Sequence, residues 1–190
     1  MEHVAIVAAV VALAACQQAP PPEQAEAGPA PGTPEWKIQN AMSAAPTAVG
    51  QGAAVMDFGP DGKLVELRAG ANGWTCLPDN PATPGNDPMC VDQNFMVWVS
   101  GWLGHTTPVI KTVGFAYMLQ GGTDASNSDP FKMKPDSGET WVDTGPHVMI
   151  VIPNARGLAG LTTDPAGGGP FIMWQNTPYA HVMVPVRAGS

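Results

Sequence analysis

The segment that most constrains the fold runs from residue 73 to residue 92 and reads G-W-T-C-L-P-D-N-P-A-T-P-G-N-D-P-M-C-V-D. It carries Cys76 and Cys90, and the remaining cysteine of the chain is Cys16. The loop between Cys76 and Cys90 is rich in proline and polar residues, so it has little apolar surface with which to hold its own shape. We therefore predict a disulfide between them, which joins the N-terminal half of the domain to a helix that starts near Cys90.

The composition indicates a loop-rich globular protein. Of 190 residues, 22 are glycine and 21 are proline, which is above average use and predicts many turns. Only 13% of the residues are charged, the net charge is −8, and lysine and arginine form no cluster. Nucleic-acid-binding proteins carry basic patches, so the sequence predicts no nucleic-acid partner. The length fits one domain with appendages.

The first 16 residues are organised like the start of an exported lipoprotein. Residues 4–15 are an apolar run that is too short to span a bilayer and is typical of a signal-peptide core. The run leads into L-A-A-C at residues 13–16, which resembles the bacterial lipobox, a motif whose cysteine receives a diacylglyceryl group. The resemblance implies a signal peptide at residues 1–15 and lipidation of Cys16. The first residues contain no lysine or arginine, unlike most such signals, so an ordinary secretory peptide is the alternative.

A tether and one globular domain are predicted to follow. Residues 16–33 are rich in proline, alanine, glutamine and glutamate and cannot bury enough apolar surface to fold, whereas residues 34–187 form the domain. With Cys16 lipidated, the other two cysteines form an even pair, as expected in an oxidising compartment. Gln17 follows the cysteine, which by the lipoprotein sorting rule implies anchoring in the outer membrane, facing the periplasm. In a host with a single membrane, the anchor would lie on the outer face of the plasma membrane.

The first predicted helix of the domain covers residues 34–45. Thr33 is a suitable N-cap, Pro34 suits the first helical position, and Pro46 ends the helix.

The second predicted helix covers residues 88–103, with Asp87 as its N-cap and Pro88 as its first residue. Four apolar residues recur at helical spacing along it. We expect them to pack in the core, and a tryptophan-lined ligand groove is the alternative; these residues are Val91, Phe95, Trp98 and Trp102.

Short apolar and β-branched runs predict the strands. The run at residues 147–152 is nearly continuous, which indicates a buried strand, and residues 120–145 form a long polar loop. The chain is therefore predicted to be an α+β protein, in which a mostly antiparallel sheet of five to six strands packs with two helices. The predicted strands are 53–58, 63–69, 111–119, 147–152, 171–174 and 179–186.

Several short motifs give the domain a resemblance to known proteins. They are G-W-T-C at residues 73–76, P-M-C-V-D at 88–92, M-L-Q-G-G-T-D-A-S-N at 118–127 and G-P-H-V-M at 145–149. Together they resemble an uncharacterised family of bacterial exported proteins. The resemblance implies a location in the cell envelope, and it implies no activity, substrate or catalytic residue.

A repeated tripeptide is the first candidate site. His147-Val148-Met149 and His181-Val182-Met183 each lie in a predicted strand, where residues two apart share a face. Thioether and imidazole ligands together suit Cu(I), so His147, Met149, His181 and Met183 could bind copper if the strands are neighbours in register. The alternative is structural, because methionine is a common core filler and a buried histidine can donate to a backbone carbonyl or pair with an acid such as Asp143 or Asp57.

Two weaker candidates remain. Oxygen-bearing side chains in residues 124–129 have the alternation of a calcium loop, but the glycine and glutamate of such loops are absent, so a solvated loop with local turns is the alternative. The histidines could also act as general bases in an enzyme with Asp57, Asp92 or Asp143, although no hydrolase motif is present. The sequence thus predicts a lipid-anchored envelope protein that binds a ligand or partner or plays a structural part, with a copper protein and an enzyme as alternatives.

Overall fold

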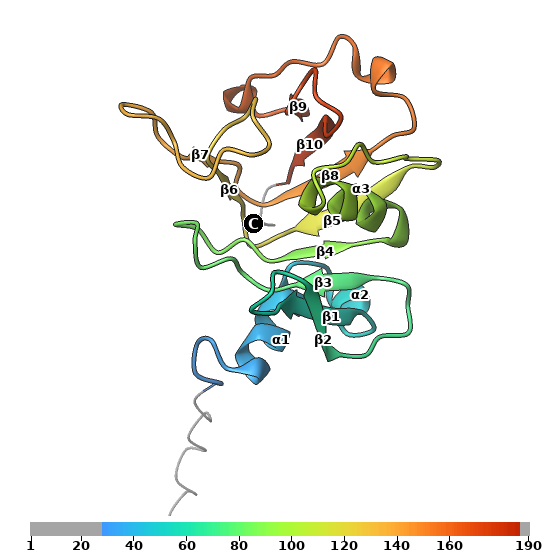
Figure 1. The fold of residues 1–190 in the computed structure, drawn as a ribbon, viewed down its shortest axis with the longest axis vertical. Coiled ribbons are helices and arrows are strands. Elements are labelled where there is room, and N and C mark those ends of the chain that lie inside the picture. Colours follow the sequence, from blue (N-terminus) through green and yellow to red (C-terminus); the bar gives the residue numbers. More distant parts are fainter. Residues whose placement is uncertain (1–27, 187–190) are drawn as a thin grey trace, which may run out of the picture.

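The computed structural model describes residues 28–186 and is an α+β fold, as predicted (Figure 1). Its helices are α1 (Pro34–Ser43), α2 (Thr47–Gly50) and α3 (Gln93–Leu103). Two strands form a small separate sheet, β6 (Thr123–Asp124) and β7 (Val142–Asp143). The large sheet has eight strands, in the spatial order β2 (Leu64–Arg68), β1 (Ala54–Phe58), β3 (Thr75–Leu77), β4 (Met89–Val91), β5 (Gly114–Met118), β8 (His147–Val151), β10 (His181–Pro185) and β9 (Phe171–Met173).

The N-terminal part of the domain follows the sequence prediction closely. Thr33 caps α1 by accepting a hydrogen bond from the Trp36 amide, and Pro34 is the first helical residue. β1 and β2 form the predicted antiparallel hairpin. The Arg68 guanidinium donates to the carbonyls of Gly50, Gln51 and Ala53, which ties the end of the hairpin to the end of α2.

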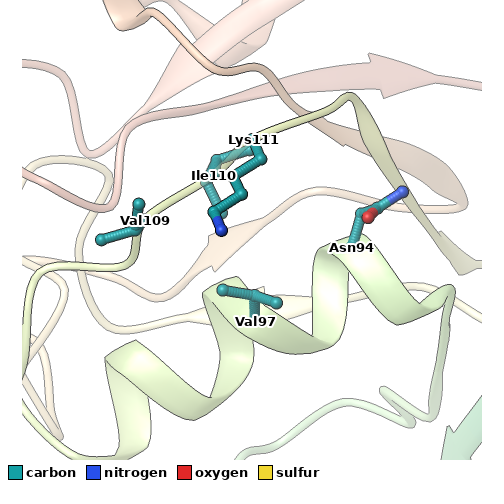
Figure 2. A pocket seen from close by; sticks show the side chains of 5 residues that line it. All are labelled: Asn94, Val97, Val109, Ile110 and Lys111. Carbon is teal, nitrogen blue, oxygen red and sulfur yellow. The ribbon is translucent and has the colours of Figure 1, made fainter.

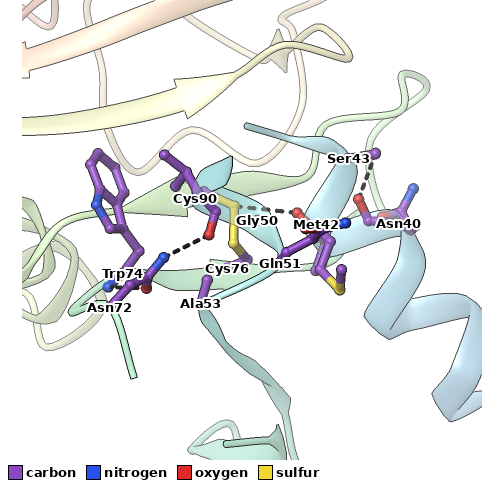
Figure 3. The surroundings of a disulfide bond; sticks show 12 residues. Asn40, Met42, Ser43, Gly50, Gln51, Ala53, Asn72, Trp74, Cys76 and Cys90 are labelled. Atoms are coloured by element: carbon purple, nitrogen blue, oxygen red, sulfur yellow. Dashed lines mark hydrogen bonds between the residues drawn. A yellow bond between two sulfur atoms is a disulfide. The ribbon is translucent and has the colours of Figure 1, made fainter. Parts of the chain in front are cut away.

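The Cys76–Cys90 disulfide is present and joins two neighbouring strands (Figure 3). Cys76 in β3 and Cys90 in β4 are direct register partners, with their Cα atoms 3.9 Å apart. The bond therefore closes the proline-rich loop at its base and fixes β3 against β4.

The predicted start of the second helix is wrong. Residues 89–91 are a strand, and α3 begins five residues after Pro88, at Gln93. Asp92 is the real N-cap, because its carboxylate accepts from the Phe95 amide at 2.7 Å. Asp87 instead accepts from the Thr83 hydroxyl and the Asn80 amide inside the loop. Pairing of Cys90 with Cys76 holds this segment extended, which local helix signals cannot reveal.

The sheet has more strands than the five to six expected. The prediction placed β3 and β4 inside the loop that carries the cysteines. It placed β6 and β7, which form the separate small sheet, inside the long loop that follows β5. The sheet is mixed, because β1 pairs in parallel with β3 while the other neighbours in it are antiparallel. The hairpin of β9 and β10 and the buried strand β8 were predicted correctly.

Two larger cores and one smaller hydrophobic cluster lie along this sheet, and the smaller cluster consists of Leu158, Ile172 and Val182. The N-terminal core surrounds the disulfide and consists mostly of small residues: Ala41, Ala44, Ala45, Ala53, Val55, Cys76 and Cys90. The C-terminal core lies between α3 and the strands from β4 to β9, and it contains larger side chains: Val91, Phe95, Trp98, Val99, Ala116, Met149, Val151, Phe171, Met173, Trp174, Tyr179 and Met183. Within residues 28–186, no helix has the length and apolar character needed to cross a membrane.

Candidate functional site

One face of the sheet gathers the predicted histidines and methionines. β8 and β10 are antiparallel neighbours, and Met149 lies directly opposite Met183. Since residues two apart in a strand share a face, His147 and His181 lie on the same face as these methionines. The two His-Val-Met tripeptides are thereby related by a local two-fold axis between Met149 and Met183, with one histidine at each end.

The outer strands extend this pattern. Met118 of β5 is the register partner of His147, and Met173 of β9 is the register partner of His181. Side chains directly opposite one another on antiparallel strands have Cβ atoms about 5 Å apart. The face therefore presents two histidines and four methionines. The sequence had identified both histidines and two of the methionines, Met149 and Met183.

A cavity of about 600 Å³ lies over this face. Its volume is in the range typical of small-molecule sites, and its wall is mostly apolar. α3 packs against β4, β5 and β8 on one side of it (Figure 1). The wall includes six methionines, Met89, Met118, Met133, Met149, Met173 and Met183, three tryptophans, Trp98, Trp102 and Trp174, and five ionisable side chains, Asp87, His105, Asp124, His147 and His181.

The tryptophans form a stacked group at one end of the cavity. Trp98 lies parallel to Trp174 with ring centroids 5.6 Å apart, and Trp102 stacks on both. His181 meets Trp98 and Trp174 edge-on, at centroid distances of 5.0 and 5.2 Å. Trp98 is buried, as predicted for the core, whereas Trp102 is only partly buried. The helix thus supplies both core packing and cavity wall.

Both histidines have a defined tautomer. The Nδ1 of His147 is 2.7 Å from the Gly145 carbonyl, and the Nδ1 of His181 is 2.9 Å from the Tyr179 carbonyl. A carbonyl oxygen can only accept, so each Nδ1 carries the proton and each Nε2 presents a lone pair. Metal-binding histidines commonly donate their other ring N–H to a carbonyl in this way, which orients the ring for binding through Nε2.

The Nε2 of His147 is buried and has no hydrogen-bond partner within the described residues. A buried acceptor without a partner is costly, and native proteins contain few of them. The ring packs next to Gly122, where an added Cβ atom would lie 2.8 Å from the His147 Cε1 and 3.4 Å from the Met118 Cε. The imidazole and the Met118 methyl group therefore lie close together at the wall of the cavity.

Burial keeps both imidazoles neutral near pH 7. Loss of hydration lowers the pKa of His181 to about 4, with a smaller contribution from the nearby His147. Loss of hydration also lowers the pKa of His147, although its bond to Gly145 acts in the opposite direction. Neutral imidazoles can accept a hydrogen bond or bind a metal ion, whereas imidazolium cannot.

The two carboxyl groups in the cavity wall are shifted in the opposite direction. Burial raises the pKa of Asp124 to about 7, and the charge of Asp87 adds to the shift. Burial also raises the pKa of Asp87 to about 6, against the lowering effect of its hydrogen bond from Thr83. At pH 7 Asp124 is therefore about half protonated and Asp87 is mostly ionised, so the negative charge of the wall lies at these two carboxyl groups, whereas the face with the histidines and methionines is uncharged.

A second, shallower cavity of about 330 Å³ lies between α3 and the segment that precedes β5 (Figure 2). Asn94 and Val97 of α3 face Val109, Ile110 and Lys111 across it. It has one charged group and no buried polar atom without a partner, so the larger cavity is the stronger candidate site.

The acids proposed as partners of the histidines are used elsewhere. Asp57 forms a 2.5 Å ion pair with Lys37, and Asp92 caps α3. Asp143 accepts from the Gly145 amide at 2.9 Å. His147 is thus held by a backbone carbonyl rather than by one of these acids.

The candidate calcium loop at residues 124–129 is held by local turns. The Ser126 hydroxyl accepts from the amides of Ser128 and Asp129, and Asp129 accepts from the Phe131 amide. Asn127 donates to the Thr163 carbonyl. Within residues 28–186, no group of three or more His, Cys, Asp or Glu side chains is placed to hold a metal ion. Cys16 lies outside the described residues.

The sequence missed part of this site. Met173 and Trp174 belong to no motif, and Met118 stands only at the start of the motif at residues 118–127. Asp124 was considered as part of a calcium loop, with a solvated loop as the alternative, and not as part of this cavity. The period-of-two pattern of residues 116–118 and 171–173 could have suggested that Met118 and Met173 share the histidine face, but only with the strand order known.

Comparison of the chain with protein-family models, with curated proteins and with solved structures found no match.

Proposed function

We propose that this chain is a binding protein that holds a small, mostly apolar molecule with a hydrogen-bond donor in the cavity over β5, β8, β10 and β9. The observation that carries the proposal is the buried, unpartnered Nε2 of His147 in the wall of that cavity. A ligand N–H or O–H would satisfy this lone pair and remove its cost.

The rest of the wall supports a flat, apolar ligand. The stacked Trp98, Trp102 and Trp174 offer aromatic surface, and methionines adapt to irregular shapes. The neutral state of the histidines near pH 7 keeps their part of the wall uncharged.

The cell envelope is the proposed location. The lipobox at residues 13–16 supports a lipid anchor on Cys16, with the tether of residues 16–33 leading to the domain. The Cys76–Cys90 disulfide agrees with an oxidising compartment. In this setting the domain would capture its ligand at the periplasmic face of the outer membrane.

N-phenyl-1-naphthylamine tests the binding proposal, because it is neutral, flat and carries one N–H donor. Fluorescence titration of the purified full chain should give saturable binding of one molecule, with quenching of tryptophan emission. The matched probe is its N-methyl derivative, which lacks the donor. We expect the derivative to bind about tenfold more weakly, the value of one hydrogen bond of about 1.4 kcal/mol.

His147→Phe is the matched protein variant, since it keeps an aromatic ring but removes the acceptor. It should reduce binding of the amine to the level of the N-methyl derivative and leave the binding of the derivative unchanged. Absence of saturable binding of either probe to the folded wild type would contradict the proposed function.

A further inference from the structure

We propose that the histidine–methionine face is also a binding site for a soft monovalent metal ion, Cu(I) in the cell, held by the Nε2 of His147 and by thioethers from Met118, Met149 and Met183. Both proposals use the Nε2 of His147, but the metal site needs the methionine thioethers and not the aromatic end of the cavity.

The strand register brings these donors together. Met118 lies directly opposite His147 on β5, and Met149 follows His147 two residues along β8. Met183 lies directly opposite Met149 on β10, which places it diagonally across from His147. Directly opposite Cβ atoms are about 5 Å apart and diagonal ones about 7–8 Å. Flexible thioether side chains can cover such distances.

The side-chain contacts at Gly122 support this arrangement. The Cε atom of Met118 and the Cε1 atom of His147 both lie within 3.4 Å of the point where a Gly122 Cβ would be. Cε1 is bonded to Nε2, so a thioether and the free imidazole nitrogen occupy the same small region. The absence of a side chain at Gly122 leaves room for both.

The chemistry of the donors selects the ion. Thioethers are soft, uncharged ligands that suit Cu(I), and imidazole binds it as well, whereas Ca²⁺ and Mg²⁺ require oxygen ligands. A neutral imidazole with Nδ1 fixed by the Gly145 carbonyl is ready to bind through Nε2 without losing a proton. The donors carry no charge, so a monovalent ion leaves less charge to bury than a divalent one.

His147 is the better of the two related positions. Its Nε2 is buried without a partner, whereas the ring of His181 is packed edge-on against Trp98 and Trp174. We therefore expect one ion per chain, bound at the His147 end of the two-fold arrangement.

Silver nitrate in chloride-free buffer is the probe, because Ag(I) has the softness of Cu(I) and does not change oxidation state. The full chain carries Cys16→Ser in every sample, so that no free thiol binds silver. Native mass spectrometry should show one Ag(I) per chain, and the melting temperature should rise with silver. A folded protein that takes up no Ag(I) would overturn the site.

Two variants test the metal site, and the methionine variant also separates it from the proposed organic ligand site, since His147 serves both. Met149→Leu with Met183→Leu removes two thioethers but keeps the apolar wall, so Ag(I) affinity should fall by about tenfold or more while N-phenyl-1-naphthylamine still binds. His147→Phe should also abolish uptake. Unchanged Ag(I) affinity in both variants would overturn the proposal.

Met96→Leu is the control, because Met96 packs on the C-terminal core without lining the cavity. It should bind Ag(I) like the parent chain. If the double variant does not fold, as judged by near-ultraviolet circular dichroism, the single change Met118→Leu takes its place, and it should weaken Ag(I) binding while Met96→Leu does not.

Discussion

The two larger cores of this domain lie along the same sheet but differ in the size and type of their side chains. The N-terminal core is made of alanine, valine and a disulfide, and its backbones approach so closely that side chains are excluded at some positions. A Cβ at Gly70 would lie 1.9 Å from the backbone nitrogen of Ala54, and one at Gly50 would lie 2.4 Å from the Met42 carbonyl oxygen. The C-terminal core consists mostly of aromatic, methionine and valine side chains beside a cavity of about 600 Å³. We infer that the first core fixes the scaffold and the second provides adaptable binding surface.

The largest loss of stability is expected for Phe95→Ala. Phe95 is fully buried between α3 and the sheet and contacts Trp98, with ring centroids 5.1 Å apart. Truncation should cost about 3–5 kcal/mol in chemical denaturation, because it leaves a void beside the cavity. A cost below about 1 kcal/mol would mean that the C-terminal core collapses freely around the change.

Removing the disulfide tests the N-terminal core. Cys76→Ala with Cys90→Ala should lower the free energy of unfolding by roughly 3 kcal/mol, since the bond closes a loop of about 15 residues in the unfolded chain. Binding of N-phenyl-1-naphthylamine to the folded variant should be nearly unchanged. A large loss of binding at full folding would show that the two cores are coupled rather than separate.

The pH dependence of stability should come from the C-terminal core. The pKa of His181 falls from 6.5 unfolded to about 4 folded, so stability is lost as pH decreases from about 6.5 to about 4, by roughly 3 kcal/mol in total. The lowered pKa of His147 acts in the same direction. Asp124, with a pKa raised to about 7, acts oppositely, because its neutral form is favoured and stability is lost as pH rises from 3.8 to about 7. The raised pKa of Asp87 adds to that opposite effect.

His181→Phe isolates the histidine contribution. The ring can still contact the tryptophans, and the Tyr179 carbonyl keeps its hydrogen bond from the Trp98 indole. The difference in the free energy of unfolding between the variant and the wild type should favour the variant more at pH 4.5 than at pH 7.5, as measured by denaturation at both values. Asp124→Asn is the matched change and should shift the balance in the opposite direction. Parallel pH profiles for all three proteins would contradict this origin of the pH dependence.

The smallest effects are expected for two substitutions that compare how well each core tolerates a change of side chain. Gly70→Ala adds one methyl group against a backbone and should cost about 1–3 kcal/mol, whereas Met149→Leu in the C-terminal core should cost less than about 1.5 kcal/mol. Thermal denaturation of the two variants measures both. Equal costs would remove the contrast between a fixed and an adaptable core.

The sequence predicted what local patterns determine. The cap of α1 at Thr33, the β1–β2 hairpin, the burial of Phe95 and the α+β class all follow from turn chemistry and periodicity. The start of α3 was misplaced because Asp87-Pro88 carries a stronger local helix signal than Asp92, and the pairing of Cys90 with Cys76 overrides it. Pairing between residues that are distant in the sequence cannot be predicted from local sequence patterns.

The candidate site was predicted in part for the same reason. The repeated His-Val-Met tripeptide indicated that a histidine and a methionine share a face in each strand. Adjacency of β8 and β10 and the register that sets Met149 against Met183 depend on the whole sheet. The burial of Asp124 depends on how a long loop folds back over the cavity, which its polar composition did not indicate.

Nitrogen-15 chemical shifts of the His147 imidazole test the central claim most directly. A long-range ¹H–¹⁵N spectrum at pH 7.5 should show a neutral ring with the proton on Nδ1 and a free lone pair on Nε2. Addition of N-phenyl-1-naphthylamine should shift the Nε2 resonance as it accepts a hydrogen bond and leave Nδ1 nearly unchanged. A proton on Nε2, or an Nε2 resonance unaffected by saturating probe, would contradict the account.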